Sequence, residues 1–372
     1  MTEVIRPDLF RIDPSHTVSP GFKILRVKHG PRKQTFLNQL SVAPTIESLS
    51  EPNRPRGDYE VAVSEKLFES IEDGDIAIVS ERGTIRVLLS RKANQNTLLV
   101  TEQCDNRCSF CSQPPKDNDD SWLLINAAMA VADFGLNGTI GITGGEPLLY
   151  GDAFVNFLDF VAEHTPQTEL HILSNGRAFS NLEFAKRIAG RNPPQMTFGI
   201  PLYAAIPQIH DELVGARGAF SETFAGLINA GNLGIPIELR IIPTSKNIQE
   251  IAHIVELVNR CLSSVAQISI MNLEPAGWAK KNWSQLYEDP MVYKDALLAA
   301  LSFSSGSGPN IALFNYPLCH LPEELRSYAV KSISDWKNFY PEECNECSLQ
   351  DSCTGFFSSS QGKFHQSPRR II

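Results

Sequence analysis

The sequence predicts an α/β protein built around a parallel sheet. From about residue 96 onward, short β-branched segments alternate with segments of helical periodicity. Parallel strands need long crossover connections, usually helices, so this alternation favours a parallel sheet over an antiparallel one. Such a sheet can curl into a partial or full barrel, and ligand sites are then expected at the carboxyl ends of its strands.

Six segments are predicted as strands from their apolar, β-branched composition. They are Thr97–Thr101, Thr139–Thr143, Glu169–Leu173, Met196–Leu202, Ile237–Ile242 and Ala266–Asn272. Between them, apolar residues recur at positions i, i+3, i+4 and i+7, which indicates helices with one buried face. Two sets follow this spacing: Phe154, Phe157, Leu158 and Val161, and Ile251, Ile254, Val255 and Val258.

Residues 1–95 predict a small, mostly β N-terminal module. Within Asp75–Leu89, two β-branched runs are joined by a Glu-Arg-Gly turn, which is typical of a hairpin. Ser41–Asp58 is rich in Pro, Ser, Glu and Arg and is predicted as an exposed loop or linker. We expect two further parts, a core over residues 96–305 and a C-terminal region over residues 306–372.

The composition of the chain limits the classes of function that are possible. The chain has 372 residues, 42% hydrophobic and 20% charged, which suits a globular enzyme with a sizeable core. The net charge of −9 and the lack of a long basic run argue against a broad nucleic-acid surface, although a small RNA-binding patch stays open. No signal peptide and no membrane-spanning segment are expected, so we predict a cytoplasmic protein. In that compartment, eight cysteines are expected to be metal ligands rather than disulfides.

Cys104, Cys108 and Cys111 form a CxxxCxxC motif directly after the first predicted strand. Soft sulfur ligands favour iron–sulfur clusters, zinc or copper(I). A zinc knuckle is the simpler interpretation, but three thiolates are too few to close a four-ligand site and no fourth ligand is nearby. A 4Fe–4S cluster held by three thiolates would keep one iron free to bind another ligand, and the cysteines alone leave the choice of metal open.

The second and third predicted strands also end in motifs suited to ligand binding. They lead into Thr143-Gly144-Gly145-Glu146-Pro147 and Ser174-Asn175-Gly176. Glycines let the backbone turn sharply and approach a ligand closely. A motif this short would, in isolation, indicate only an ordinary strand-to-helix turn. We expect these motifs at the same rim as the cysteines.

Taken together, the CxxxCxxC motif, Phe110 before its last cysteine and the Gly-Gly-Glu-Pro segment resemble the radical S-adenosylmethionine (radical SAM) superfamily over roughly residues 96–290. The resemblance implies a partial (β/α)6 barrel with a 4Fe–4S cluster on Cys104, Cys108 and Cys111. The open iron would chelate the amino and carboxylate groups of S-adenosylmethionine. One electron would then break the sulfonium bond and release a 5′-deoxyadenosyl radical, which abstracts hydrogen from the substrate.

The resemblance also implies contacts to the nucleotide. Gly144, Gly145 and Glu146 would meet the methionine amino group, and Phe110 would lie near the adenine. No residue is assigned as a catalytic acid or base.

Three further residues are candidates for cofactor contacts. Ser174 and Asn175 are candidates for the ribose side. Arg240 could pair with the methionine carboxylate, because a guanidinium matches carboxylate geometry. Many relatives that modify peptides carry a Ser-Leu-Asp-Gly type segment on strand four, whereas this chain has Pro201–Ala204, so no ribose contact is assigned there.

Four more cysteines lie near the C-terminus: Cys319, Cys344, Cys347 and Cys353. Four thiolates can close either a tetrahedral zinc site or a complete cubane cluster. The layout resembles the twitch region appended to many radical SAM enzymes, which implies a second, auxiliary 4Fe–4S cluster for electron relay or structure. His320 is expected to be a bystander.

A narrower resemblance concerns the segments Thr101–Cys104, Cys111–Pro115 and Ser332–Asn338. They resemble the smaller radical SAM maturases of His-Xaa-Ser systems. This implies modification of a ribosomally made precursor peptide with His-Xaa-Ser repeats, beside a second radical SAM maturase. A flavodoxin- or ferredoxin-type protein would donate electrons, and the N-terminal module or the tail region could hold a leader segment.

Two alternatives stay open. One is a radical SAM enzyme that acts on a small metabolite, a nucleoside or a glycyl-radical partner; the other is a non-catalytic metal-binding protein. Two further expectations concern structure. Cys261 is predicted to be a core thiol, and Asp211, beside His210, is predicted to cap a helix N-terminus.

Overall fold

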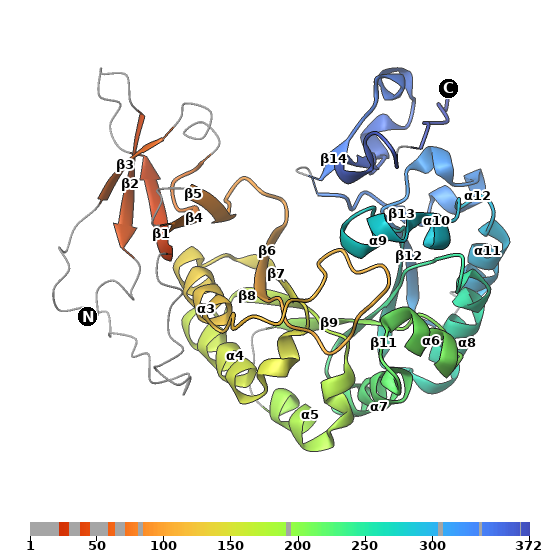
Figure 1. Ribbon diagram of the computed structural model, residues 1–372, viewed down its shortest axis with the longest axis horizontal. Helices are drawn as coiled ribbons and strands as arrows, with labels where there is room; N and C mark the ends of the chain where they lie inside the picture. The colour runs from red at the N-terminus through yellow and green to blue at the C-terminus, as the bar shows by residue number, and fades with distance from the viewer. Residues whose placement is uncertain are drawn as a thin grey trace. The chain divides into compact units, whose positions relative to one another are not determined.

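The computed structural model describes residues 22–29, 38–44, 59–63, 71–80, 85–190, 195–303, 308–334, 337–364 and 366–372 (Figure 1). The chain divides into two compact units. Unit 1 comprises Met1–Thr101, Asp117–Ile172 and Arg191–Met196, and unit 2 comprises Glu102–Lys116, Leu173–Gly190 and Thr197–Ile372. Within the described ranges, no helix has the length and apolar character needed to cross a membrane.

The predicted α/β fold with a parallel sheet is confirmed. Eight strands form one sheet in the order β13-β12-β11-β10-β9-β8-β7-β6, and the residue-by-residue pairings recorded within it are parallel. They are β6 (Asn96–Thr101), β7 (Gly138–Gly144), β8 (Thr168–Leu173), β9 (Met196–Pro201), β10 (Ile237–Ile241), β11 (Val265–Met271), β12 (Asn310–Phe314) and β13 (Ala329–Val330). The six predicted strands correspond to β6–β11, and no end differs by more than one residue. The sequence did not predict β12 and β13.

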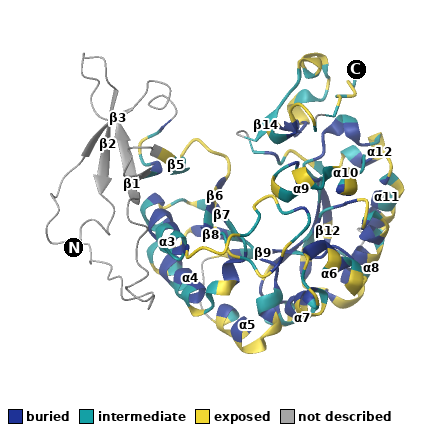
Figure 2. Ribbon diagram, in the orientation of Figure 1, coloured by how far each residue is buried: buried dark blue, intermediate teal, exposed yellow. Residues whose placement is uncertain are grey.

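Helices connect these strands, as a parallel sheet requires. They are α3 (Trp122–Phe134), α4 (Asp152–His164), α5 (Leu182–Ala189), α6 (Pro207–Val214), α7 (Ala219–Asn232), α8 (Ile251–Cys261), α9 (Gly277–Lys281), α10 (Trp283–Leu286), α11 (Lys294–Ser302) and α12 (Glu323–Arg326). Both predicted periodic sets are buried, one along α4 and the other along α8. Figure 2 shows that α6–α8 carry both buried and exposed residues, as amphipathic helices do.

The prediction that Cys261 is a core thiol is wrong. Cys261 is the last residue of α8 and is exposed. Leu262 has already left the helical region, at φ −129° and ψ 54°, and its side chain is buried. Because the helix ends here, Leu262 covers the core in place of Cys261.

The N-terminal strands form a separate antiparallel sheet within unit 1, in the order β3-β2-β1-β4-β5. They are β1 (Phe22–His29), β2 (Asn38–Pro44), β3 (Tyr59–Val63), β4 (Ile76–Ser80) and β5 (Ile85–Leu89). The predicted hairpin is confirmed by the pairing of β4 with β5, and its turn at residues 81–84 lies outside the described residues. The predicted loop is wrong for residues 41–44, which belong to β2, and residues 45–58 are not described. The boundaries after residues 95 and 305 stay predictions.

Strand β10 in unit 2 has one apolar and one polar face. On β10, Ile237, Leu239 and Ile241 are buried, whereas the alternating positions are Glu238 and Arg240. In parallel strands that are covered on both faces, the sequence is usually apolar throughout. Polar residues on alternate positions therefore indicate that one face of β10 lines a site rather than a packed core. The neighbouring strand continues this face, because Arg240 pairs in register with Ser269.

Candidate functional site

The three cysteines of the CxxxCxxC motif lie close together in the loop that follows β6, within unit 2. Burial, followed by the neighbouring Cys111 and Cys104, raises the pKa of the Cys108 thiol well above its ordinary value. Burial raises the pKa of the Tyr203 phenol, and the same three cysteines add to that rise, so they lie near it. Thiols crowded in this way cannot all ionise unless a cation compensates their charge. The donor set therefore fits an iron–sulfur cluster, whose ligands are thiolates.

The end of helix α6 holds the first half of this loop. The backbone N–H groups of Arg107 and Ser109 donate to the carbonyls of Val214 (2.8 Å) and Leu213 (2.9 Å). Gly215 makes this approach possible, because it has a positive φ of 63° and a Cβ there would lie 2.6 Å from the carbonyl oxygen of Arg107. The loop conformation is thus set by backbone contacts with α6.

The start of helix α9 holds the second half. The carbonyl of Cys111 accepts from the N–H of Trp278 at 2.8 Å. The side-chain amide of Asn282 donates to the carbonyl of Ser109 at 2.7 Å. Gly277, at φ 51°, approaches so closely that a Cβ would lie 2.4 Å from the Cys111 carbonyl oxygen. The third cysteine is therefore fixed by a residue far along the chain.

Phe110 lies in an apolar cluster beside the cysteines. Its ring meets that of Tyr203 edge to face, with 4.8 Å between ring centroids. Leu213 and Leu273 are buried in the same cluster, and Cys108 packs against it. Only 5% of Phe110 is exposed, so it belongs mainly to the core. Its predicted contact with adenine stays a prediction.

Arg240 lies on the polar face of β10 and retains hydrogen-bonding capacity. Its Nη2 donates to the sulfur of Met271 at 2.8 Å, and sulfur is a weak acceptor. Its Nε is buried, 3.7 Å from Glu238 Oε1, and has no hydrogen-bond acceptor among the described residues. Burial raises the pKa of the Tyr203 phenol and Arg240 offsets part of that rise, so Arg240 lies near the phenol that the cysteines affect. A carboxylate could accept hydrogen bonds from this guanidinium. The predicted contact between Arg240 and the methionine carboxylate stays a prediction.

The Gly144–Glu146 turn belongs to unit 1. The N–H of Gly145 donates to the carbonyl of Thr101 at 2.9 Å. A Cβ on Gly144 would lie 2.5 Å from the same oxygen, so β6 and β7 need glycine there. Glu146 is 1% exposed, and its Oε1 accepts from the N–H of Leu148 at 2.9 Å. The contacts of these three residues with a nucleotide stay predictions.

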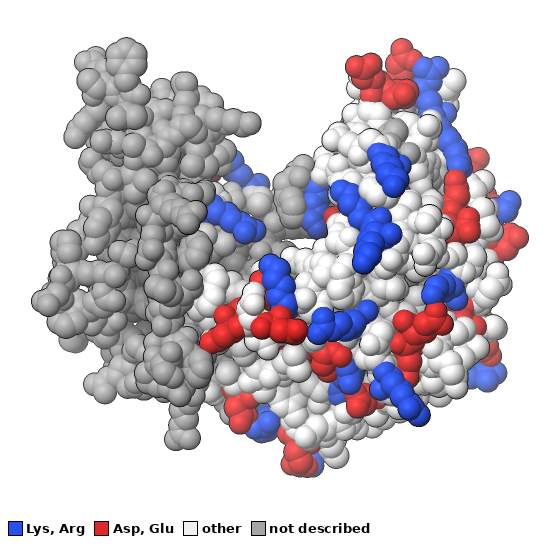
Figure 3. Space-filling view, viewed as in Figure 1, with Lys and Arg blue, Asp and Glu red and all other residues white. Residues whose placement is uncertain are grey.

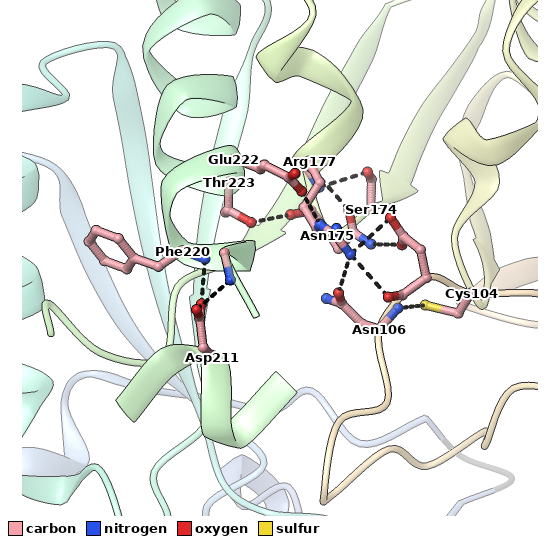
Figure 4. A network of polar contacts seen from close by, with 12 residues as sticks. Cys104, Asn106, Ser174, Asn175, Arg177, Asp211, Phe220, Glu222 and Thr223 are labelled. Atoms are coloured by element: carbon pink, nitrogen blue, oxygen red, sulfur yellow. Dashed lines mark hydrogen bonds and ion pairs between the residues drawn. The ribbon is translucent and has the colours of Figure 1, made fainter. Parts of the chain in front are cut away.

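Ser174 and Asn175 follow β8 in unit 2, and both are bonded within the chain. Ser174 Oγ accepts from the N–H of Gly176 at 3.0 Å. Asn175 Nδ2 donates to Asp105 Oδ1 at 2.6 Å, and its Oδ1 accepts from the N–H of Arg177 at 3.0 Å (Figure 4). The sequence did not predict the contact between Asp105 and Asn175, because 70 positions separate them. Their predicted ribose contacts stay predictions.

Asp211 caps a helix N-terminus, as predicted, and the helix is α7, which follows its own. It lies inside α6, and its carboxylate accepts from the N–H groups of Gly218 (2.6 Å) and Phe220 (2.8 Å) at the start of α7 (Figure 4). The short α6–α7 connection brings that helix end to it. His210 is buried and accepts from the N–H of Tyr203 through Nδ1. Burial lowers the pKa of His210 to about 4.

The four C-terminal cysteines line a single small pocket in unit 2, together with Arg369 and Arg370. Burial, and then the charges of the other three cysteines, raise the pKa of Cys344 to about 11. Cys353 Sγ accepts from the N–H groups of Leu318 and Gly355, each at 3.4 Å. This set of thiols also fits a metal cofactor.

His320 Nε2 lies 3.1 Å from the carbonyl of Ser367, and its ring packs edge to face on Phe356. Over the described ranges, no three His, Cys, Asp or Glu side chains are grouped as a single metal ion would require.

Comparison with known proteins identifies a domain. Residues 98–258 match the model of the Radical SAM superfamily. Among curated relatives, the chain is 22% identical to the "Probable GTP 3′,8-cyclase" of Pyrobaculum aerophilum, over 67% of this chain and 77% of that protein. It is 26% identical to the GTP 3′,8-cyclase of Campylobacter jejuni (strain RM1221), over 48% of this chain and 55% of that protein.

Parts of the chain are also similar to solved structures. Streptococcus suis SuiB bound to precursor peptide SuiA is 16% identical, with a TM-score of 0.46 over 58% of this chain and 48% of that one. A radical SAM methyltransferase from Sphaerobacter thermophilus is 15% identical, with a TM-score of 0.45 over 68% of this chain and 81% of that one. The matched domain begins in β6, two residues into the strand, and includes the cysteine motif and the Gly-Gly-Glu-Pro turn. Residues 98–258 are thus a radical SAM domain, and the chain is an enzyme.

Proposed function

We propose that this enzyme is a peptide maturase that modifies a ribosomally made precursor containing His-Xaa-Ser repeats. The observation that carries the proposal is the presence of two separate thiol sites in one chain, the triplet at Cys104–Cys111 and the pocket of four cysteines. This pair resembles the domain plan of maturases with an auxiliary cluster. The resemblance of Ser332–Asn338 and of the cysteine flanks to His-Xaa-Ser maturases supports the same substrate class.

The triplet is proposed to hold the cluster that binds S-adenosylmethionine. When bound, a 4Fe–4S cluster supplies the electron that cleaves the sulfonium. Cys104, Cys108 and Cys111 would be its ligands, and Arg240 would hold the methionine carboxylate. Phe110 and Tyr203 exclude water from one side of the cysteines, because both rings are buried. A dry site protects reactive intermediates from side reactions.

The pocket of four cysteines is proposed to hold a second 4Fe–4S cluster for electron relay or structure. Two N–H groups already bond to Cys353 Sγ, and such bonds stabilise a thiolate. The polar face of β10 and β11 is proposed to meet the substrate. A flavodoxin- or ferredoxin-type donor would supply electrons, and a second radical SAM maturase would act on the same precursor.

The function is tested by co-expressing the enzyme with a candidate His-Xaa-Ser precursor and measuring the mass of the purified peptide. We expect a mass change that requires Cys108 and that is absent when the chain carries Cys108→Ala. An unchanged precursor, with S-adenosylmethionine cleavage intact, would exclude this substrate. A labelled leader segment added to the full-length chain would then show by fluorescence anisotropy whether the enzyme binds it.

A second candidate is chemistry on a small nucleotide. The curated relatives named as GTP 3′,8-cyclases favour it, at 22% and 26% identity. Incubating the reduced, reconstituted enzyme with GTP and S-adenosylmethionine distinguishes the two. A new guanosine-derived product with no peptide product would replace the proposal, whereas unchanged GTP would leave the peptide as the substrate.

A further inference from the structure

A polar network in unit 2 ties the cysteine loop to the end of β8 (Figure 4). At its centre is Arg177, whose side chain is 16% exposed. Its Nη1 donates to the carbonyl of Asp105 at 3.0 Å and to Asn106 Oδ1 at 2.8 Å. It also pairs with the Asp105 carboxylate at 3.0 Å. The guanidinium of Arg177 therefore bonds to both residues that follow Cys104, Asp105 and Asn106.

Helix α7 supports this network from the other side. Glu222 Oε2 accepts from Arg177 Nε at 2.6 Å, and Thr223 Oγ1 donates to the carbonyl of Asn175 at 3.0 Å. Gly226 lets α7 pack directly on the turn, because a Cβ there would lie 2.2 Å from the carbonyl oxygen of Gly176. The turn after β8 is held between α7 and the cysteine loop.

The network reaches a cysteine sulfur through one more bond. The N–H of Asn106 donates to Cys104 Sγ at 3.4 Å, and Arg177 holds the side chain of the same asparagine. Hydrogen bonds to sulfur ligands and nearby charge tune the reduction potential of iron–sulfur clusters. Groups that orient ligands also govern how firmly a metal is held.

We propose that Arg177 and Asn175 are positioning residues for the cysteine loop, and that Asn175 acts there rather than as a ribose contact. The inference rests on the proposed cluster at Cys104, Cys108 and Cys111. Arg177 contributes positive charge and orients Asn106. Asn175 contributes the amide that holds the Asp105 carboxylate.

The test uses the full-length, reconstituted enzyme and follows the reduced cluster signal that responds to S-adenosylmethionine. Arg177→Met removes the charge and leaves Asp105 and Glu222 uncompensated, so we expect a more negative midpoint potential. We expect about a tenfold shift in the reduction equilibrium, which is 59 mV for one electron. The matched control is Arg260→Met, which removes an arginine that is 74% exposed and paired with Glu256 on α8, and no shift is expected.

Glu222→Gln distinguishes an electrostatic effect on the midpoint potential from damage to the fold. It removes a negative charge, so the midpoint potential should become more positive. Equal negative shifts in the Arg177 and Glu222 variants, or no shift in either, would overturn the inference.

Asn175→Ala decides between positioning and ribose binding. A negative midpoint shift, with S-adenosylmethionine affinity within about twofold, supports positioning. Weakened affinity at an unchanged midpoint would establish the ribose contact instead. If the unmodified enzyme gives no signal that responds to S-adenosylmethionine, both the proposed function and this inference are wrong. A signal that is present but unmoved by Arg177→Met overturns the inference alone.

Discussion

The two thiol sites differ in how the chain brings their cysteines together. The first draws three cysteines from the eight residues Cys104–Cys111, and the ends of α6 and α9 hold the loop through backbone groups. The second draws four from Cys319–Cys353, and backbone N–H groups reach the Cys353 sulfur directly. Three thiolates leave room for a further ligand, and four close a cluster. The first site is therefore suited to substrate chemistry, and the second to electron relay or structure.

The largest effect is expected from Cys108→Ala. Two thiolates cannot hold the first cluster, so 5′-deoxyadenosine should fall to background and about half of the iron should be lost. Product chromatography and iron analysis of the anaerobically purified enzyme measure both. Retained cleavage of S-adenosylmethionine would contradict the ligand assignment and remove the distinction between the sites.

Cys347→Ala tests the other side of the comparison. Cleavage of S-adenosylmethionine should stay within about threefold, while modified precursor falls at least about tenfold, because the first site does not need this thiol. Metal analysis of the purified variant accompanies both assays. A loss of zinc with unchanged iron would show that the second pocket is a structural zinc site.

Gly277→Ala perturbs the first site through the backbone alone. A Cβ at φ 51° would meet the Cys111 carbonyl, and strain together with overpacking should cost about 3 kcal/mol of unfolding free energy. Gly234→Ala is the matched control, since it also has a positive φ (74°) but nothing within 4 Å, and about 1 kcal/mol is expected. Urea denaturation measures both. Equal costs would mean that α9 does not constrain the cysteine loop.

The smallest effect is the pH dependence contributed by His210. Its pKa of about 4 in the folded chain lies below the ordinary value of 6.5, so the unfolded state binds the proton more readily. This stability is complete above pH 6.5 and is lost as the pH falls towards 4, by about 2 kcal/mol at pH 5. Urea midpoints of the cluster-free chain at pH 7 and pH 5 measure it. His210→Gln should remove the dependence, whereas His253→Gln, at an exposed position, should preserve it.

Local patterns predicted the parallel sheet well. Strands β6–β11 have β-branched runs long enough to identify, and α4 and α8 show clear helical spacing. By contrast, β13 has only two residues, Ala329 and Val330, and carries no periodic signal. Short strands depend on pairing with a neighbour, which a local pattern does not show.

The candidate site was predicted less completely. The cysteines were found because metal ligands cluster in sequence, but Arg177 and Asp105 were not. Their contact joins segments 72 positions apart, and only the return of β8 beside the loop creates it. Asp211 shows the same limit, since its cap acts on α7 rather than on its own helix.

The spread of the second thiol site along the chain has a consequence for biogenesis. Cys319 precedes Cys353 by 34 positions, so bringing them together carries a loop-closure cost that the compact triplet avoids. Thr354, beside Cys353, accepts from the N–H groups of Ser332 and Ile333, and Ser332 is hydrogen-bonded to Asn315 just after β12. These hydrogen bonds connect the segment that carries Cys353 to the end of β12. The four C-terminal cysteines therefore meet only once residues 332–354 have joined the end of β12, whereas sequence spacing alone keeps Cys104, Cys108 and Cys111 near one another.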